Sequence, residues 1–143
     1  MAVSDIDALE VITAVAAVGG EPWIVGGWGV DALLERQTQV HRSLELMVRA
    51  EALERCVKAL SDKGFQVSND ARPVRVELDD GIGILVLHPV EPDGAGGWWQ
   101  PLADGQRRHL PPGSVVGGLL GGRTVSCASP DALRTLLGDN PAP

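Results

Sequence analysis

The stretch that most constrains the fold runs from Trp23 to Leu46 and reads WIVGGWGVDALLERQTQVHRSLEL. Its apolar start predicts a short buried strand that is stopped by two glycines. The residues after the glycines predict a helix with Val30, Leu33 and Leu34 on one face. The alternating segment HRSLELMVR then predicts a second strand. The chain therefore builds a strand, a helix and a strand around one glycine turn.

Three other segments have the spacing of helices. Residues 4–18 predict a helix capped by Ser4, and its apolar face is expected to hold Ile6, Leu9, Ile12, Thr13 and Ala16. Residues 50–64 predict a second helix, whose apolar stripe is Leu53, Cys56, Val57 and Leu60. Residues 129–137 predict a last helix, with Ser129 as its cap and Pro130 at its first position.

The remaining segments predict strands and one long loop. Residues 65–70 indicate a short strand or turn, and residues 74–90 indicate a hairpin around the turn DDGIG. The stretch from Glu91 to Gly113 is rich in Gly and Pro, which predicts a long functional or covering loop. A last short strand is predicted at RTVSCAS, residues 123–129.

Length and composition favour one soluble domain. We expect residues 1–143 to form a single α+β domain, a mixed sheet flanked by helices, with a frayed tail at 138–143. No apolar run reaches the roughly 18 residues that span a bilayer, and the acidic N-terminus does not resemble a signal peptide. We therefore expect a cytoplasmic protein that binds no membrane, with Cys56 and Cys127 as buried thiols.

The net charge of −7 argues against nucleic acid as a partner. Polyanions favour clustered Lys and Arg, whereas this chain has two lysines and ten scattered arginines. We expect a small organic molecule as the partner. The tryptophan-containing loop and the short last helix are also compatible with a homodimer.

The glycine turn and the residues around it resemble a known family. The matching positions are Gly26, Gly27, Trp28, Val30, Asp31, Arg36, Thr38 and His41. This order of residues resembles the small lincosamide and aminoglycoside adenylyltransferases of the nucleotidyltransferase superfamily. The segments RPVRVEL, ILVLHPV and GGRTVSCAS resemble later strands of that family, so the resemblance covers nearly the whole chain. It implies a nucleotidyltransferase-like α+β fold.

The resemblance also implies a metal site, which this chain matches poorly. The family places two aspartates in an Asp-x-Asp strand and a third before Leu-His-Pro. In this sequence the three positions are occupied by Ser43, Glu45 and Val86. Magnesium requires near-octahedral oxygen ligands, and valine supplies none. We therefore expect no bound metal and no cofactor.

The family's cleft, carried over by position, implies a set of site residues. The catalytic candidates are Glu45, His88, Asp31 and Glu77. The substrate-binding candidates are Trp28, Ser43, Arg75, Val86, Trp98 and Trp99. Gly26 and Gly27 are candidates for binding a phosphate through backbone N–H groups. The apolar Val86 is expected to raise the pKa of a nearby carboxylic acid, which would suit a general acid.

Each candidate also has a structural alternative. Asp31 could pair with Arg36 or support the glycine turn, and His41 could pack against the following loop. Arg75 and Glu77 could form an ordinary ion pair. The two adjacent tryptophans could cover the cleft, fill the core or form a dimer contact.

Three functions remain open at this point. The favoured hypothesis is a degenerate nucleotidyltransferase fold that has lost magnesium-dependent transfer. It would use Glu45 and His88 for metal-independent acid/base chemistry on a small organic molecule, for instance in natural-product biosynthesis. One alternative is a non-catalytic protein that binds an antibiotic or regulates a partner. The other is an active antibiotic nucleotidyltransferase with a non-standard metal site, using Glu45 with Glu77 or Asp79.

Overall fold

The computed structural model describes residues 2–138. Its helices are α1 (Asp5–Ala17), α2 (Gly26–Leu34), the short 3-10 turn η1 (Ala50–Ala52), α3 (Leu53–Ser61) and α4 (Pro130–Gly138). Its strands are β1 (Trp23–Val25), β2 (Ser43–Arg49), β3 (Gln66–Ala71), β4 (Arg75–Asp79), β5 (Ile84–Pro92), β6 (Trp98–Pro101), β7 (Arg107–Leu110), β8 (Val115–Leu120) and β9 (Arg123–Ala128).

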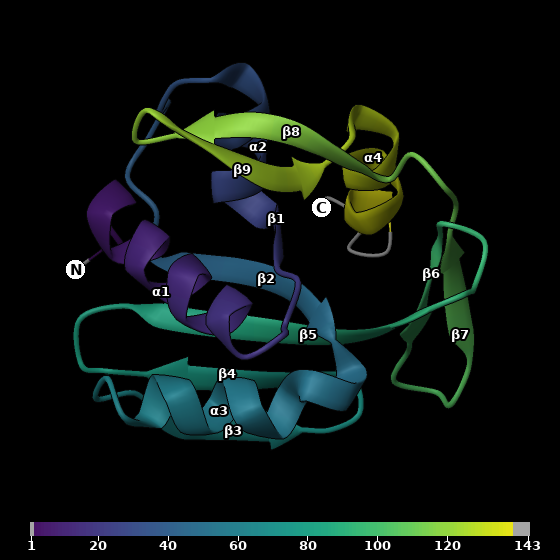
Figure 1. Cartoon of the computed structure of the whole chain (residues 1–143), viewed down its shortest axis with the longest axis horizontal. Helices are drawn as coiled ribbons and strands as arrows, with labels where there is room; N and C mark the ends of the chain where they lie inside the picture. Colours follow the sequence, from purple (N-terminus) through teal and green to yellow (C-terminus); the bar gives the residue numbers. More distant parts are fainter. Residues whose placement is uncertain (1, 139–143) are drawn as a thin grey trace.

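The strands form one mixed sheet, as the α+β prediction requires. Its order is β3-β4-β5-β2-β1-β9-β8, and the β6–β7 hairpin continues from the end of β5 (Figure 1). The β2–β5 and β1–β9 pairs are parallel, and the other pairs are antiparallel. Helices α1 and α3 lie side by side over one part of the sheet (Figure 1).

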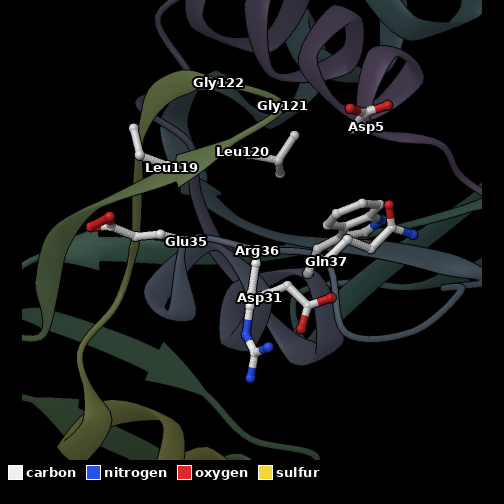
Figure 2. A pocket seen from close by; sticks show the side chains of 10 residues that line it. Asp5, Asp31, Glu35, Arg36, Gln37, Leu119, Leu120, Gly121 and Gly122 are labelled. Atoms are coloured by element: carbon white, nitrogen blue, oxygen red, sulfur yellow. The ribbon is translucent and has the colours of Figure 1, made fainter.

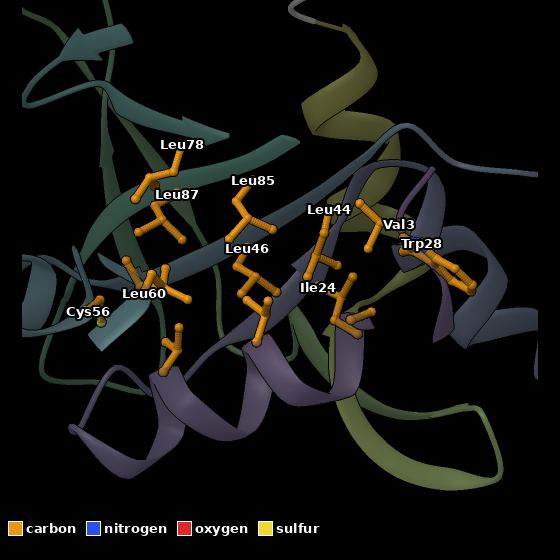
Figure 3. Close-up of a cluster of buried hydrophobic side chains, with 14 of the residues drawn as sticks. Val3, Ile24, Trp28, Leu44, Leu46, Cys56, Leu60, Leu78, Leu85 and Leu87 are labelled. Carbon is orange, nitrogen blue, oxygen red and sulfur yellow. The ribbon is translucent and has the colours of Figure 1, made fainter. Parts of the chain in front are cut away.

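Alternation along β2, β4 and β5 separates the main core from the opposite face of the sheet. Figure 3 shows the core leucines of these strands together with residues of α3 and β1. The strand residues that face this core are Leu44, Leu46, Val48, Val76, Leu78, Leu85 and Leu87. Because side chains alternate across a strand, residues such as Ser43, Glu45 and Met47 point to the other face. That face carries the candidate site.

Helix α1 begins as predicted but buries a different face. The Ser4 side chain accepts a hydrogen bond from the Asp7 backbone N–H, at 3.1 Å. The buried residues are Ala8, Val11 and Val15, whereas Ile6 is 66% exposed. Apolar residues surround most of this helix, so their spacing alone does not select the face that packs.

Helix α2 also differs from its predicted face. It starts directly at Gly26 and buries Trp28, Asp31 and Ala32, while Val30 and Leu34 are exposed. Gly29 explains the choice, because a Cβ atom there would lie 2.8 Å from the backbone oxygen of Ile24. The close approach of α2 to β1 therefore requires glycine, and it turns Trp28 and Asp31 inward.

The predicted long loop after Glu91 is wrong. Strand β5 continues to Pro92, and the hairpin β6–β7 follows; β8 was also missed. Trp98 packs against Trp23 with ring centroids 6.3 Å apart, so it belongs to a second core beneath α4. Trp99 lies between the guanidinium of Arg107, at 4.4 Å, and the ring of His109, at 4.7 Å.

The other predicted elements agree with the structure. Helix α3 buries Leu53, Cys56 and Leu60, and the Ser129 hydroxyl caps α4 by accepting from the Ala132 N–H. Both cysteines are buried free thiols, and burial raises the pKa of Cys56 to about 11. Among the described residues, no helix is long and apolar enough to cross a membrane. A frayed tail was predicted at 138–143. Residues 139–143 lie outside the described residues, and Gly138 is the last residue of α4.

Candidate functional site

A row of side chains crosses three strands on the face opposite the main core. Glu45 of β2 is in register with Val86 of β5, and Val86 is in register with Glu77 of β4. Residues in register on neighbouring strands point to the same face of a sheet. The sheet therefore places Val86 between two glutamates, and its buried side chain separates them.

The structure brings Glu45 and His88 together. His88 lies two residues after Val86 on the same face of β5, and its Nε2 is 3.0 Å from Glu45 Oε1. The other carboxylate oxygen rests against Gly26 at the start of α2, where a Cβ atom would lie 2.4 Å from Oε2. Gly26 also has a φ of 68°. The positive φ favours glycine at this position, and the Glu45 carboxylate occupies the space that a Cβ atom would take.

Glu45 is ionised at neutral pH, which corrects an expectation. The hydrogen bond from His88 lowers the pKa of Glu45 and outweighs the opposing effect of burial; the charges of His88 and Arg75 lower it further. The apolar Val86 was expected to raise the pKa of a nearby carboxylic acid. That expectation fails because His88 bonds directly to the carboxylate. An ionised Glu45 can accept a proton or bind a cation, and it has no proton to donate as a general acid.

The Glu45–His88 pair lines a cavity of about 450 Å³. Its polar lining consists of Glu45, His88, Gln100, Arg108, Gly26 and Gly27. Its apolar lining consists of Val25, Val30, Met47, Leu133, Leu136 and Leu137. An apolar cavity with a few convergent polar groups is the usual form of a small-molecule site.

The sequence analysis missed Gln100 and Arg108. They lie opposite each other on β6 and β7, and the Gln100 Oε1 atom accepts hydrogen bonds from Arg108 Nε at 3.2 Å and Nη2 at 2.7 Å. Both residues fall in the stretch that was predicted to be a loop. The segments GWWQP and QRRHL show no alternation of apolar and polar residues, so the sequence carried no clear signal for this strand pair.

Asp31 belongs to a separate buried network. Its carboxylate accepts hydrogen bonds from the Thr38 N–H at 2.9 Å, the Thr38 hydroxyl at 2.6 Å and His41 Nε2 at 2.7 Å. Burial alone would raise the pKa of Asp31, but the bonds from Thr38 and His41 outweigh it, and the pKa lies below the ordinary value. Asp31 thus ties the loop after α2 to the helix, a structural role in which its side-chain partners are Thr38 and His41 rather than the expected Arg36.

Trp28 accompanies Asp31 rather than Glu45. Its ring stacks on His41 with centroids 4.7 Å apart. Both Trp28 and Asp31 line a smaller cavity of about 270 Å³, in which Asp5 of α1 and Leu120 of β8 also take part (Figure 2). His41 supports the glycine turn as well, because a Cβ on Gly27 would lie 2.5 Å from His41 Nδ1. The predicted orienting role of Asp31 toward Glu45 and His88 has no direct contact to support it.

The other predicted site residues lie around the cavity rather than in it. Glu77 accepts a hydrogen bond from Asn69 Nδ2 at 2.7 Å and pairs with Arg75 at 3.6 Å, which is the ordinary ion-pair alternative. Ser43 shares the face of Glu45 on β2. Trp98 and Trp99 do not line the Glu45–His88 cavity.

The side chains at the expected metal positions do not fit a magnesium ion held by protein alone. Glu45 offers a carboxylate and Ser43 a hydroxyl, whereas Val86 offers no ligand atom. Across residues 2–138, no group of three or more His, Cys, Asp or Glu side chains is placed to hold a metal ion. A magnesium ion that is bound to a nucleotide commonly takes one or two carboxylate ligands from the protein. Of the three expected metal positions, only Glu45 would supply a carboxylate.

The substitution Val86→Asp tests whether the missing carboxylate at position 86 explains the poor fit to magnesium. A buried carboxylate between Glu45 and Glu77 is expected to lower the free energy of unfolding by about 2–4 kcal/mol without metal. The added oxygen ligands should let millimolar MgCl₂ restore part of that loss, measured by urea denaturation with MgCl₂ or EDTA. The restoration should vanish in Val86→Asp/Glu45→Gln. An equal magnesium response in wild type and Val86→Asp would contradict the prediction.

Comparison with known proteins identifies the family. Residues 7–136 match the aminoglycoside-2''-adenylyltransferase family, and the chain belongs to it. A lincosamide resistance protein of Staphylococcus haemolyticus is 33% identical over 69 residues, which are 48% of this chain and 43% of that protein. The matched segment therefore spans less than half the length of this relative.

Solved structures show the same fold. A lincosamide adenylyltransferase with lincomycin bound superposes with a TM-score of 0.85 at 23% identity, covering 94% of this chain and 86% of that one. An aminoglycoside adenylyltransferase in complex with adenylyl-2''-tobramycin gives a TM-score of 0.74 at 22% identity, covering 97% and 78%. The predicted nucleotidyltransferase-like α+β fold is confirmed.

The favoured function from the sequence was wrong. Nearly the whole chain matches a family described as adenylyltransferases. This match does not agree with a degenerate fold that performs metal-independent acid/base chemistry. Nothing in these relatives points to natural-product biosynthesis. The alternative of an active antibiotic nucleotidyltransferase fits them better.

Proposed function

We propose that this protein transfers a nucleotidyl group from a nucleoside triphosphate to a hydroxyl group of a small antibiotic-like molecule. The observation that carries the proposal is the ionised Glu45, bonded to His88, in a cavity at the start of α2. The family of the chain supports the reaction class. The cavity volume of about 450 Å³ suits a small-molecule ligand.

The reaction needs one proton acceptor and an in-line arrangement. The acceptor hydroxyl loses its proton, its oxygen forms a bond to the α-phosphorus, and the bond from that phosphorus to the pyrophosphate oxygen breaks. Glu45 accepts the proton in this scheme, because it is ionised and lies in the cavity. His88 holds one carboxylate oxygen and so fixes the direction of the other. A positioned base of this kind contributes about 10²- to 10⁴-fold to a rate.

Two relatives suggest which acceptors to test. One solved relative holds lincomycin and another holds adenylyl-2''-tobramycin. Among the residues that the structure describes, the lining of this cavity has six apolar residues and one carboxylate, Glu45. A polycationic aminoglycoside needs several anionic partners, so this lining favours an acceptor with few charges, such as a lincosamide.

The test is a transfer assay with the purified protein. ATP and MgCl₂ are incubated with lincomycin or tobramycin, pyrophosphate release is followed, and the acceptor is analysed by mass spectrometry. We expect the acceptor to gain one adenylyl group for each pyrophosphate released, with lincomycin preferred. An acceptor that binds at stoichiometric amounts and stays chemically unchanged would refute transfer and indicate a binding protein.

A further inference from the structure

Gln100 brings a hydrogen-bond donor to the Glu45–His88 cavity. It lies on β6, lines this cavity and is only 6% exposed. Its Oε1 atom accepts hydrogen bonds from Arg108 Nε at 3.2 Å and from Arg108 Nη2 at 2.7 Å. An arginine side chain can only donate, so the amide atom that faces Arg108 must be the oxygen. The amide nitrogen, Nε2, is left for another partner.

The amide nitrogen of Gln100 is open to a ligand. Among residues 2–138, Gln100 Nε2 makes no hydrogen bond. In the same part of the chain, it is not among the side-chain polar atoms that are both fully buried and unsatisfied, so it is accessible from the cavity that Gln100 lines. An unpaired donor on a buried side chain is unfavourable, and such a donor in a cavity indicates a place for a ligand atom.

We propose that the Gln100 amide donates a hydrogen bond to a carbonyl oxygen of the acceptor molecule and so selects acceptors that carry one. This inference deepens the proposed function and rests on it for the role of the ligand as acceptor. Glu45 takes the proton of the reacting hydroxyl, while Gln100 holds a second oxygen of the same molecule. Gln100 is a binding residue in this scheme, and it transfers no proton.

The chemistry of the cavity favours a carbonyl oxygen over a hydroxyl group as the partner of Gln100. Both lone-pair directions of Oε1 are taken by Arg108, so the free part of the amide only donates. A hydroxyl group would bring a proton that needs an acceptor of its own. Among the described lining side chains, the anionic acceptor is Glu45, which serves the reacting hydroxyl. A carbonyl oxygen only accepts, and Gln100 alone satisfies it.

The apolar part of the lining makes this hydrogen bond selective. Met47 of β2 and Leu133, Leu136 and Leu137 of α4 line the same cavity. Their side chains offer the ligand no hydrogen bond that could replace the one from Gln100. A ligand without a carbonyl oxygen would cover the Gln100 amide and leave it unpaired. Sites of this kind discriminate strongly against ligands that lack the matching polar atom.

Three substitutions separate the hydrogen bond from other effects. Gln100→Glu keeps oxygens that can accept from Arg108, but it removes the amide donors and sets a carboxylate against the carbonyl oxygen. Gln100→Leu removes the donors without adding a charge, and each Gln100 variant serves if the other fails to fold. Gln106→Glu is the matched control. Gln106 lies between β6 and β7 in the same hairpin, is exposed and does not line the cavity.

The experiment measures binding by calorimetry, both without nucleotide and with α,β-methylene-ATP and MgCl₂. The probes are lincomycin, which contains an amide carbonyl, and its reduced analogue, in which a methylene group replaces that carbonyl. Wild type is expected to bind lincomycin more tightly than the analogue. Both Gln100 variants should bind lincomycin about 10- to 100-fold more weakly, the range for a ligand group left unpaired. The analogue should lose less than about threefold in the same variants, and Gln106→Glu should bind both probes like wild type.

Three results would overturn the inference. One is a wild-type protein that binds neither probe under either condition, and another is equal lincomycin affinity in wild type and in the folded Gln100 variants. The third is an equal loss for lincomycin and its analogue, which would show general damage to the cavity. A protein that binds lincomycin through Gln100 but transfers nothing would refute only the proposed function. A protein that modifies lincomycin and binds it equally well in Gln100→Leu would refute only this inference.

Discussion

Glu45→Gln is expected to lower the rate of nucleotidyl transfer by about 10²- to 10⁴-fold. Glutamine keeps the shape of the side chain, and its amide oxygen can still accept the hydrogen bond from His88 Nε2, now 3.0 Å from Glu45 Oε1. It cannot take a proton from the acceptor hydroxyl. The loss should therefore appear in kcat, measured as pyrophosphate release at saturating ATP and acceptor.

The pKa of Glu45 adds a pH signature to this prediction. Because the hydrogen bond from His88 lowers that pKa, Glu45 stays ionised at and below the ordinary pKa of a glutamate, about 4.3. Protonation of Glu45 should therefore cause no loss of activity between neutral pH and about pH 5. His88→Ala removes the partner, so the pKa should rise and the acid limb should move to higher pH.

Glu77→Gln is the matched control for this prediction. Glu77 lies on the same face, two strands away, and is bonded to Asn69 and Arg75 outside the cavity. Its substitution should change the rate by less than about threefold, as is usual for residues away from the reacting groups. A large loss in Glu77→Gln with an active Glu45→Gln would show that the base lies elsewhere along the row.

The sequence predicted most of the fold where its signals were local. Caps at Ser4 and Ser129, the DDGIG turn and the stripe of α3 depend on neighbouring residues, and each agrees with the structure. The β6–β7 hairpin was missed because its short strands do not alternate between apolar and polar residues and lie in a stretch rich in Gly and Pro. The buried faces of α1 and α2 were misjudged because close contacts such as Gly29 with β1 decide them.

The sequence predicted only part of the candidate site, because the rest depends on contacts between residues that are distant in the chain. Glu45 and His88 are 43 residues apart, and the family resemblance placed them together, as the parallel β2–β5 pairing does. Gln100, Arg108 and the leucines of α4 reach the cavity through tertiary packing, which no local pattern encodes. The lowered pKa of Glu45 is due first to the hydrogen bond from His88, whereas the sequence analysis considered only the apolar neighbour Val86.

Asp31→Ala is expected to lower the free energy of unfolding by about 3–5 kcal/mol. The carboxylate is 2% exposed and accepts from Thr38 and His41. Removing it leaves the buried His41 and the N–H and hydroxyl groups of Thr38 without this partner and frees the loop between α2 and β2. This loss is a large part of the roughly 5–15 kcal/mol that stabilises a domain. Urea denaturation at neutral pH measures it, and Asp62→Ala, an exposed carboxyl, should stay within about 0.5 kcal/mol of wild type.

The pH dependence of the same stability separates charge from packing. The pKa of Asp31 is lower in the folded chain than its ordinary value, so the stabilisation is fully present above about pH 4 and is lost as pH falls further. Asp31→Asn keeps the volume but cannot ionise. Its stability deficit relative to wild type should therefore be constant near neutral pH and shrink below about pH 4. A deficit that stays constant down to about pH 2 would contradict the lowered pKa of Asp31 in the folded chain.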